Sequence, residues 1–62
     1  MKYETGDVLI TTANISHGIN IPVGSMCLVL CHRNLLIDFG GGIQGYFKYY
    51  RNKRYFTKIG TL

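Results

Sequence analysis

The chain has 62 residues, a mass of 7.0 kDa and a formal net charge of +4 from seven basic and three acidic residues. This length fits one domain over residues 1–62, because a fold of about 60 residues buries only about 60% of the surface that its unfolded chain exposes. It is too short for a large apolar pocket or a multi-residue catalytic apparatus. With 47% hydrophobic and 16% charged residues, the composition also argues against intrinsic disorder.

The first third of the chain predicts one strand followed by a long loop. Thr5-Gly6-Asp7 is typical of a turn, and the aliphatic and β-branched run over residues 8–12 is typical of a strand. The stretch 13–24 contains two Asn, two Gly and the only Pro, so it predicts a long, partly ordered loop that its isoleucines hold in place. Pro22 lacks an N–H group and therefore does not fit a central strand.

The middle of the chain predicts two strands. Residues 26–32 are apolar on both faces of an extended strand, which is expected either to be covered on both sides or to wrap round a core. The polar pair Arg33-Asn34 indicates a tight turn. In the next strand, 35–39, apolar residues occupy one face and Asp38 marks the other as facing solvent.

The last third predicts two more strands. Gly40 to Gly42 indicate a flexible break, and Gly45 indicates a bulge or bend at the start of an aromatic strand over 46–50. A polar connection over 51–54 leads to a brief strand over 55–59. No window combines good helix formers with an apolar stripe of helical spacing, so the sequence predicts an all-β fold.

A sheet of five short strands exposes unpaired backbone N–H and C=O groups at its edges unless it curls into a small barrel. The opening Gly6-Asp7-Val8, and the turn Ile21-Pro22-Val23-Gly24-Ser25-Met26 before the second strand, resemble SH3-like small barrels of the KOW-type and phage-encoded groups. The resemblance implies a five-stranded SH3-like barrel with a long first loop. A phage-encoded protein of this kind would work in the host cytoplasm. Recognition of proline-rich peptides is not expected, because the chain has no Trp and the loop over 13–24 has no acidic residue.

The strongest functional signal is the segment 46–58, in which six aromatic residues and five cations occur without a single acid. Cations neutralise phosphates and aromatic rings stack on unpaired bases, so this composition favours binding of single-stranded nucleic acid or RNA. In the predicted strand over 46–50, alternate residues share one face and present aromatic rings and a cation together. The predicted contacts are Lys48, Arg51, Lys53, Arg54 and Lys58 for phosphate, with Tyr46 and Tyr50 for stacking.

A second hypothesis uses the same face for a protein partner. Tyr and Arg are frequent interface hot spots, and small phage-type inhibitors or adaptors bind host machines such as a nuclease, a polymerase or a defence complex. The loop offers a second candidate patch in Ile15, His17, Ile19 and Ile21. Self-association into a homodimer is a third hypothesis, because a core this small gains from a partner. Packing and solubility alone are the alternative to all three.

An enzyme, a cofactor and a metal site are not expected. Two of the three carboxylates lie near the N-terminus, and Asp38 has no obvious partner carboxylate for acid–base work. Cys27 and Cys31 lie in apolar surroundings that oppose thiolate formation. These cysteines are about 13 Å apart on an extended strand, too far for a disulfide. With His17 and His32 they are poorly spaced for zinc, because the Cys27–Cys31 gap fits numerically but lies on an apolar strand and not on a turn. No apolar stretch has the length of a signal peptide or membrane span, so the expected location is the cytoplasm.

Overall fold

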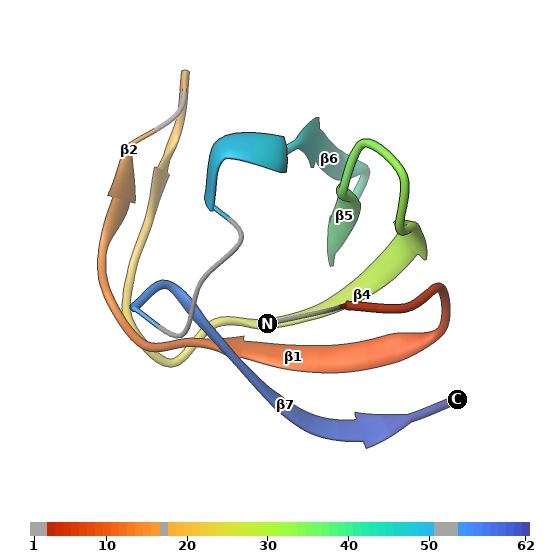
Figure 1. The fold of residues 1–62 in the computed structure, drawn as a ribbon. Helices are drawn as coiled ribbons and strands as arrows, with labels where there is room; N and C mark the ends of the chain where they lie inside the picture. The colour runs from red at the N-terminus through yellow and green to blue at the C-terminus, as the bar shows by residue number, and fades with distance from the viewer. Residues whose placement is uncertain (1–2, 17, 51–53) are drawn as a thin grey trace.

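The chain folds into a curved five-stranded antiparallel sheet with a small separate hairpin at one end (Figure 1). The computed structural model describes residues 3–16, 18–50 and 54–62. The strand order in the main sheet is β6-β5-β4-β1-β7, and β2 pairs with β3. The bounds are β1 Asp7–Thr11, β2 Ile15–Ser16, β3 Asn20–Ile21, β4 Met26–Cys31, β5 Leu36–Gly40, β6 Ile43–Tyr46, a 3-10 turn η1 Lys48–Tyr50, and β7 Phe56–Thr61.

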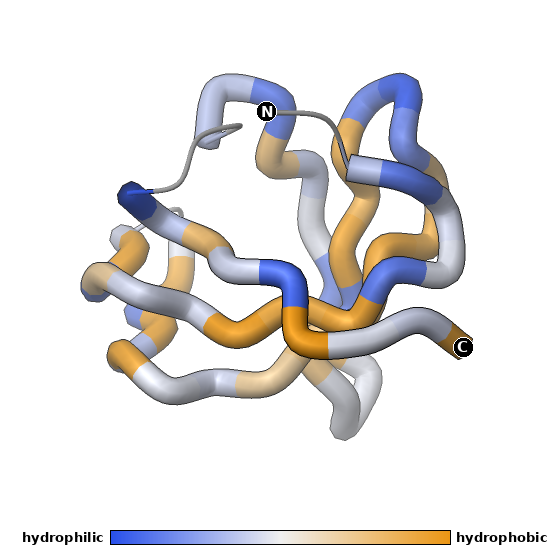
Figure 2. Tube along the Cα trace, turned by 60° about the horizontal axis from the view of Figure 1, so that its bottom comes forward, coloured by the Kyte–Doolittle hydropathy of each residue, from blue (hydrophilic) through white to orange (hydrophobic). Residues whose placement is uncertain are grey.

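The central strand of the sheet is β4, and its neighbour β1 shares its aliphatic character. Leu9 of β1 lies opposite Cys27 of β4, and both side chains are buried on the inner face. Figure 2 shows hydrophobic stretches along the strands and hydrophilic residues in several of the turns. The buried apolar core consists of Tyr3, Leu9, Ile15, Ile21, Cys27, Val29, Leu35, Ile37, Phe47 and Phe56. The prediction of an all-β fold is therefore confirmed.

Register shifts curl the sheet around this core. They occur between Val8 and Leu9 against β7, between Val29 and Cys31 against β5, and between Asp38 and Gly40 against β6. Such bulges raise the local twist of a strand. In Figure 1 the β5–β6 end of the sheet rises above β1 and β4, and η1 lies over the open side. Within the described residues no ladder joins β6 to β7, so the two edges of the sheet do not pair.

The stretch 13–24 is more ordered than a loop. β2 and β3 form a hairpin in which Ile15 lies opposite Ile21, and both isoleucines are buried. The buried Thr11 side chain holds the return to β4, because its Oγ1 donates to the Pro22 carbonyl at 2.7 Å and accepts from the Ser25 N–H at 2.9 Å. Pro22 lies just outside β3, as its missing N–H requires.

The strand predicted over 46–50 is wrong. The structure places β6 earlier, at Ile43–Tyr46, and continues as a 3-10 turn at Lys48–Tyr50. The glycine break is a tight turn in which Gly40, Gly41 and Gly42 all have positive φ, and this turn lets β6 start three residues early.

The other four predicted strands are corrected by one or two residues, and those predicted over 8–12 and 26–32 are Asp7–Thr11 and Met26–Cys31. Leu35 lies in the preceding turn with a φ of 50° and only then does β5 begin at Leu36. Its side chain is nevertheless fully buried in the core. The last strand runs over Phe56–Thr61, whereas 55–59 was predicted, and it pairs with β1 along its length.

Candidate functional site

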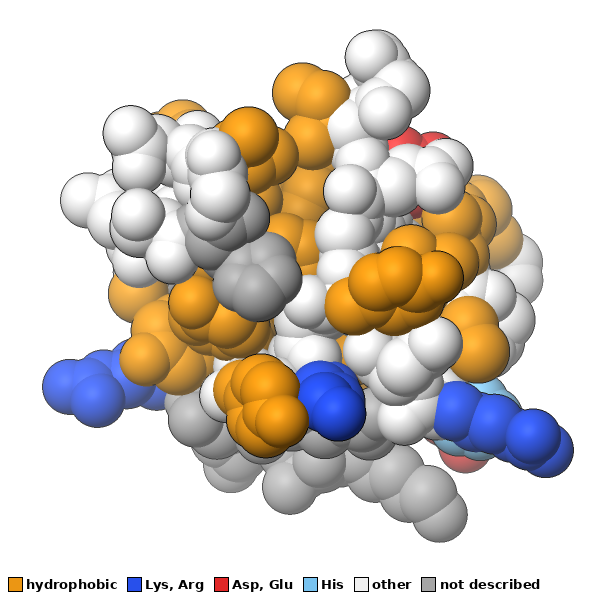
Figure 3. Space-filling view, turned by 90° about the horizontal axis from the view of Figure 1, so that it is seen from above, with side chains coloured by type: hydrophobic (Ala, Val, Ile, Leu, Met, Phe, Trp, Pro, Cys, Tyr) orange, Lys and Arg blue, Asp and Glu red, His pale blue; other side chains and the backbone are white. Residues whose placement is uncertain are grey.

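Two exposed tyrosines flank an exposed lysine where β6 passes into η1. The side chain of Tyr46 is 58% exposed and that of Tyr49 is 81% exposed, the second largest exposure among the large hydrophobic residues described. The Lys48 Nζ lies 5.0 Å from the centroid of the Tyr49 ring, within the range of a cation–π contact. Figure 3 looks onto this side of the molecule, where hydrophobic side chains lie between separate Lys and Arg side chains. We name Tyr46, Lys48 and Tyr49 the η1 surface.

Phe47 fixes the η1 surface to the core. Its N–H donates to the Leu35 carbonyl at 2.9 Å, and its buried ring packs edge-to-face against Phe39 and Phe56. Gly45 makes room for this ring, because a Cβ at Gly45 would lie 2.9 Å from the Phe47 Cε1. The exposed residues on either side of Phe47 are therefore held on a well-packed support.

Tyr50 lies at the rim of the core, away from the position expected for a stacking residue. Its N–H donates to the Phe47 carbonyl at 2.9 Å, the i to i+3 bond of a 3-10 turn. A turn with three residues per repeat places Phe47 and Tyr50 on the same, inner side. The Tyr50 ring packs edge-to-face on Phe47 and on Tyr55, and its hydroxyl donates to the Ser16 carbonyl at 3.3 Å.

Tyr49 is the residue that sequence reasoning missed as a candidate contact. A strand over 46–50 would have put it on the same face as the buried Phe47. The 3-10 turn instead leaves Lys48 and Tyr49 exposed, as Tyr46 is at the end of β6. The spacing of three between Phe47 and Tyr50 is the signal in the sequence that could have identified this turn.

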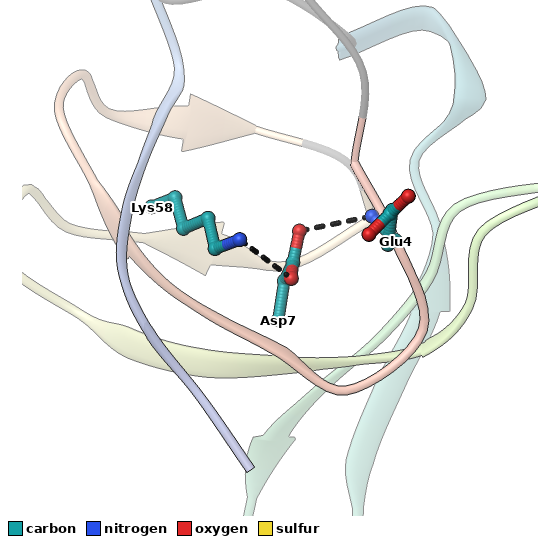
Figure 4. A network of polar contacts seen from close by, with 3 residues as sticks. All are labelled: Glu4, Asp7 and Lys58. Carbon is teal, nitrogen blue, oxygen red and sulfur yellow. Dashed lines mark hydrogen bonds and ion pairs between the residues drawn. The ribbon is translucent and has the colours of Figure 1, made fainter.

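Lys58 forms an ion pair and lies on β7, apart from the η1 surface. Its Nζ is 3.3 Å from Oδ1 of Asp7, whose side chain is only 3% exposed (Figure 4). Asp7 Oδ2 accepts a hydrogen bond from the Glu4 N–H at 2.9 Å, so both carboxylate oxygens have partners. A buried carboxylate needs such compensation. Lys58 therefore has a structural contact of its own.

Of the three remaining cations predicted to contact phosphate, only Arg54 is among the residues that the structure describes. Arg54 is exposed, and its carbonyl accepts a hydrogen bond from Thr12 Oγ1 at 2.8 Å. Arg51 and Lys53 lie outside the described residues. The structure thus leaves Tyr46 and Lys48 exposed, adds the exposed Tyr49 in contact with Lys48, and places Tyr50 and Lys58 in packing and ion-pair roles.

Among the described residues, no group of three or more His, Cys, Asp or Glu side chains is placed so that it could hold a metal ion. Both cysteines are free thiols. Burial raises the pKa of Cys27 from 9.0 to about 12, and its Sγ–H donates to the Leu9 carbonyl at 3.6 Å. His17 lies outside the described residues.

A shallow apolar groove of about 190 Å³ lies between the β2–β3 hairpin and the β5–β6 turn. Its apolar lining comes from Ile19, Ile21, Pro22, Phe39 and Ile43. Ile19 and Ile43 are 45% and 46% exposed, so both rims of the groove present aliphatic carbon to solvent.

Comparisons with known proteins return no match: no family model, no curated protein and no solved structure is similar to this chain. The structure contains no helix, within its described residues, that is long and apolar enough to cross a membrane.

Proposed function

We propose that the chain is a non-enzymatic binding module for single-stranded nucleic acid or RNA, built on an SH3-like small barrel and acting in the cytoplasm. The fold proposal is supported by the curled five-stranded sheet and by the hairpin that occupies the position of a long first loop. The observation that carries the binding proposal is the η1 surface, where two exposed tyrosines flank a lysine.

The chemistry of the η1 surface suits an unpaired strand. Each exposed ring offers a face to one base, and stacking on aromatic side chains contributes about 1–3 kcal/mol per base. Lys48, whose Nζ lies 5.0 Å from the centroid of the Tyr49 ring, supplies a cation for the phosphate that joins neighbouring bases. The exposed Arg54 is a further cation for phosphate. Arg51 and Lys53, which lie outside the described residues, are proposed phosphate contacts on the sequence alone.

The test is fluorescence anisotropy with a labelled oligouridine of about ten nucleotides. We expect affinity to fall by an order of magnitude or more between about 50 and 200 mM salt, because several phosphates release counterions on binding. Tyr49→Ala should weaken binding by about tenfold through the lost stack. The matched control is Ile59→Ala on β7, which removes a 50% exposed hydrophobic side chain without touching the η1 surface. Absence of binding at about 50 mM salt would refute the proposal.

A second candidate function is a small phage-type inhibitor or adaptor that binds a host protein machine. The groove between Ile19 and Ile43 favours it, because exposed aliphatic rims around a concave surface suit a protein side chain better than a phosphate chain. The test is a pull-down from nuclease-treated host lysate with the wild type and with Ile43→Asp. One stoichiometric protein that is retained by the wild type and lost with Ile43→Asp would favour this function.

A further inference from the structure

The outer face of the sheet carries apolar side chains that the fold leaves partly uncovered. The ladder between β1 and β4 alternates strictly: Leu9 and Cys27 form the inward, buried pair. The pairs on either side of it, Val8–Leu28 and Ile10–Met26, therefore point outward. This is the second apolar face that the sequence of β4 shows, and nothing in the described residues covers it completely.

The exposures on this face are large at two positions. Met26 is 63% exposed and Leu62, next to the end of β7, is 85% exposed. Val8, Met26, Leu28 and Leu62 line one shallow groove of about 270 Å³ together with residues of β5. We name Val8, Ile10, Met26, Leu28 and Leu62 the outer apolar face.

The charge around this groove decides what can cover it. Among the residues that the structure describes, Asp38 is the one charged residue in its lining, and no lysine or arginine of that part of the chain lines it. One oxygen of Asp38 is already engaged, because Oδ1 accepts from the Gly40 N–H at 2.8 Å. The described lysines and arginines therefore lie outside this groove, and two copies of the chain can meet here without bringing these residues together.

We propose that the outer apolar face is the contact surface of a weak homodimer, in which the sheets of two copies pack face to face. Aligned packing of two sheets is a common way to bury such faces. The whole molecule measures 23 × 23 × 19 Å. The largest cross-section of the Cα trace, about 500 Å², is an upper limit for one such face, so a dimer buries at most about 1,000 Å² in all, at the low end of specific interfaces. The dimer is therefore concentration-dependent.

The experiment is sedimentation equilibrium of the purified full chain over a range of about 10 µM to 1 mM. The weight-average mass of the wild type should rise from 7.0 kDa toward twice that value. Met26→Glu should stay monomeric throughout, because it places a carboxylate in the centre of the contact at a position exposed enough for the fold to tolerate it. Ile19→Glu is the matched control, since it adds the same charge at a 45% exposed aliphatic residue of the other groove, and it should dimerise like the wild type.

Each other result overturns the proposal. A wild type that stays at 7.0 kDa up to about 1 mM excludes a second copy and leaves the face for a different protein. A dimer that survives Met26→Glu, or one that Ile19→Glu abolishes, uses another surface. Circular dichroism of both variants confirms that they keep the β-sheet signal of the wild type, so loss of folding is not mistaken for loss of the dimer.

Discussion

Lys58 and Asp7 come from opposite ends of the chain and form an ion pair. The strength of this ion pair decides whether Lys58 stabilises the fold or is available to bind a ligand. The carboxylate is buried and the ammonium is half-exposed, at a distance of 3.3 Å. Lys58→Met keeps the aliphatic stem and leaves the carboxylate with the hydrogen bond from the Glu4 N–H. We expect a loss of about 1–2 kcal/mol in the free energy of unfolding, smaller than for a fully buried pair because solvent screens the lysine.

Urea denaturation measures this loss, and the double variant Lys58→Met with Asp7→Asn provides the control. Once the carboxylate is neutral, removal of the ammonium should cost less than it does alone, because the two changes act on one contact. An unchanged midpoint for Lys58→Met would mean that the ion pair adds nothing to stability. Lys58 would then be available for the phosphate contact that the sequence predicts.

Gly45 is a second position where one atom decides the local structure. A Cβ there would meet the Phe47 ring at 2.9 Å, whereas a Cβ at Gly60 would meet nothing within 4 Å. We expect Gly45→Ala to destabilise the fold by about 1–3 kcal/mol, because the buried ring must shift. Gly60→Ala should be close to neutral. Equal urea midpoints for the two variants would show that Phe47 moves freely, and that the η1 surface lacks the firm support inferred here.

At the scale of elements, η1 separates a packing tyrosine from an exposed one. Tyr50 contacts the Phe47 and Tyr55 rings, with centroids 5.7 and 4.9 Å away, whereas Tyr49 contacts Lys48 at the surface. Tyr50→Ala should lower the free energy of unfolding by about 1–3 kcal/mol, and Tyr49→Ala should change it by less than about 0.5 kcal/mol. Thermal denaturation of the two variants makes the comparison. A larger loss for Tyr49→Ala would reverse the inner and outer assignment of η1.

The elements also show which parts of the fold the sequence can predict. The aliphatic runs of β1 and β4 predict strands because their composition alone suits a pleated, half-buried surface. The aromatic run after Gly45 suits a strand equally well by composition. Here tertiary context decides, because the glycine turn at 40–42 starts β6 early and the buried Phe47 ends it. The β2–β3 hairpin cannot be predicted from the sequence for the same reason. Its strands are only two residues long, and they depend on the pairing of Ile15 with Ile21.

The sequence likewise predicts only part of the candidate site. Composition locates the cations and aromatics in the segment 46–58, and the exposed Tyr46 and Lys48 lie within it. Composition does not show which of them point outward, since that depends on the 3-10 turn. Nor does it show that Lys58 faces Asp7, because a contact between residues so far apart in sequence depends on the pairing of β1 with β7.

At the scale of the whole molecule, small size couples stability to self-association. A fold of about 60 residues has a thin margin, so even a weak dimer of folded chains raises the melting temperature as the protein concentration rises. A gain of about 1 kcal/mol raises the Tm of a domain of this size by about 4–8 °C. We expect a rise of this order for the wild type between about 10 µM and 1 mM.

Differential scanning calorimetry at several concentrations measures the effect, with Met26→Glu and Ile19→Glu beside the wild type. The Tm of Met26→Glu should not change with concentration, because its outer apolar face no longer supports a contact between copies. Ile19→Glu should retain the concentration dependence of the wild type. A wild-type Tm that stays constant would contradict dimerisation of the folded chain, whereas a constant Tm for Ile19→Glu alone would place the contact at the groove between the β2–β3 hairpin and the β5–β6 turn.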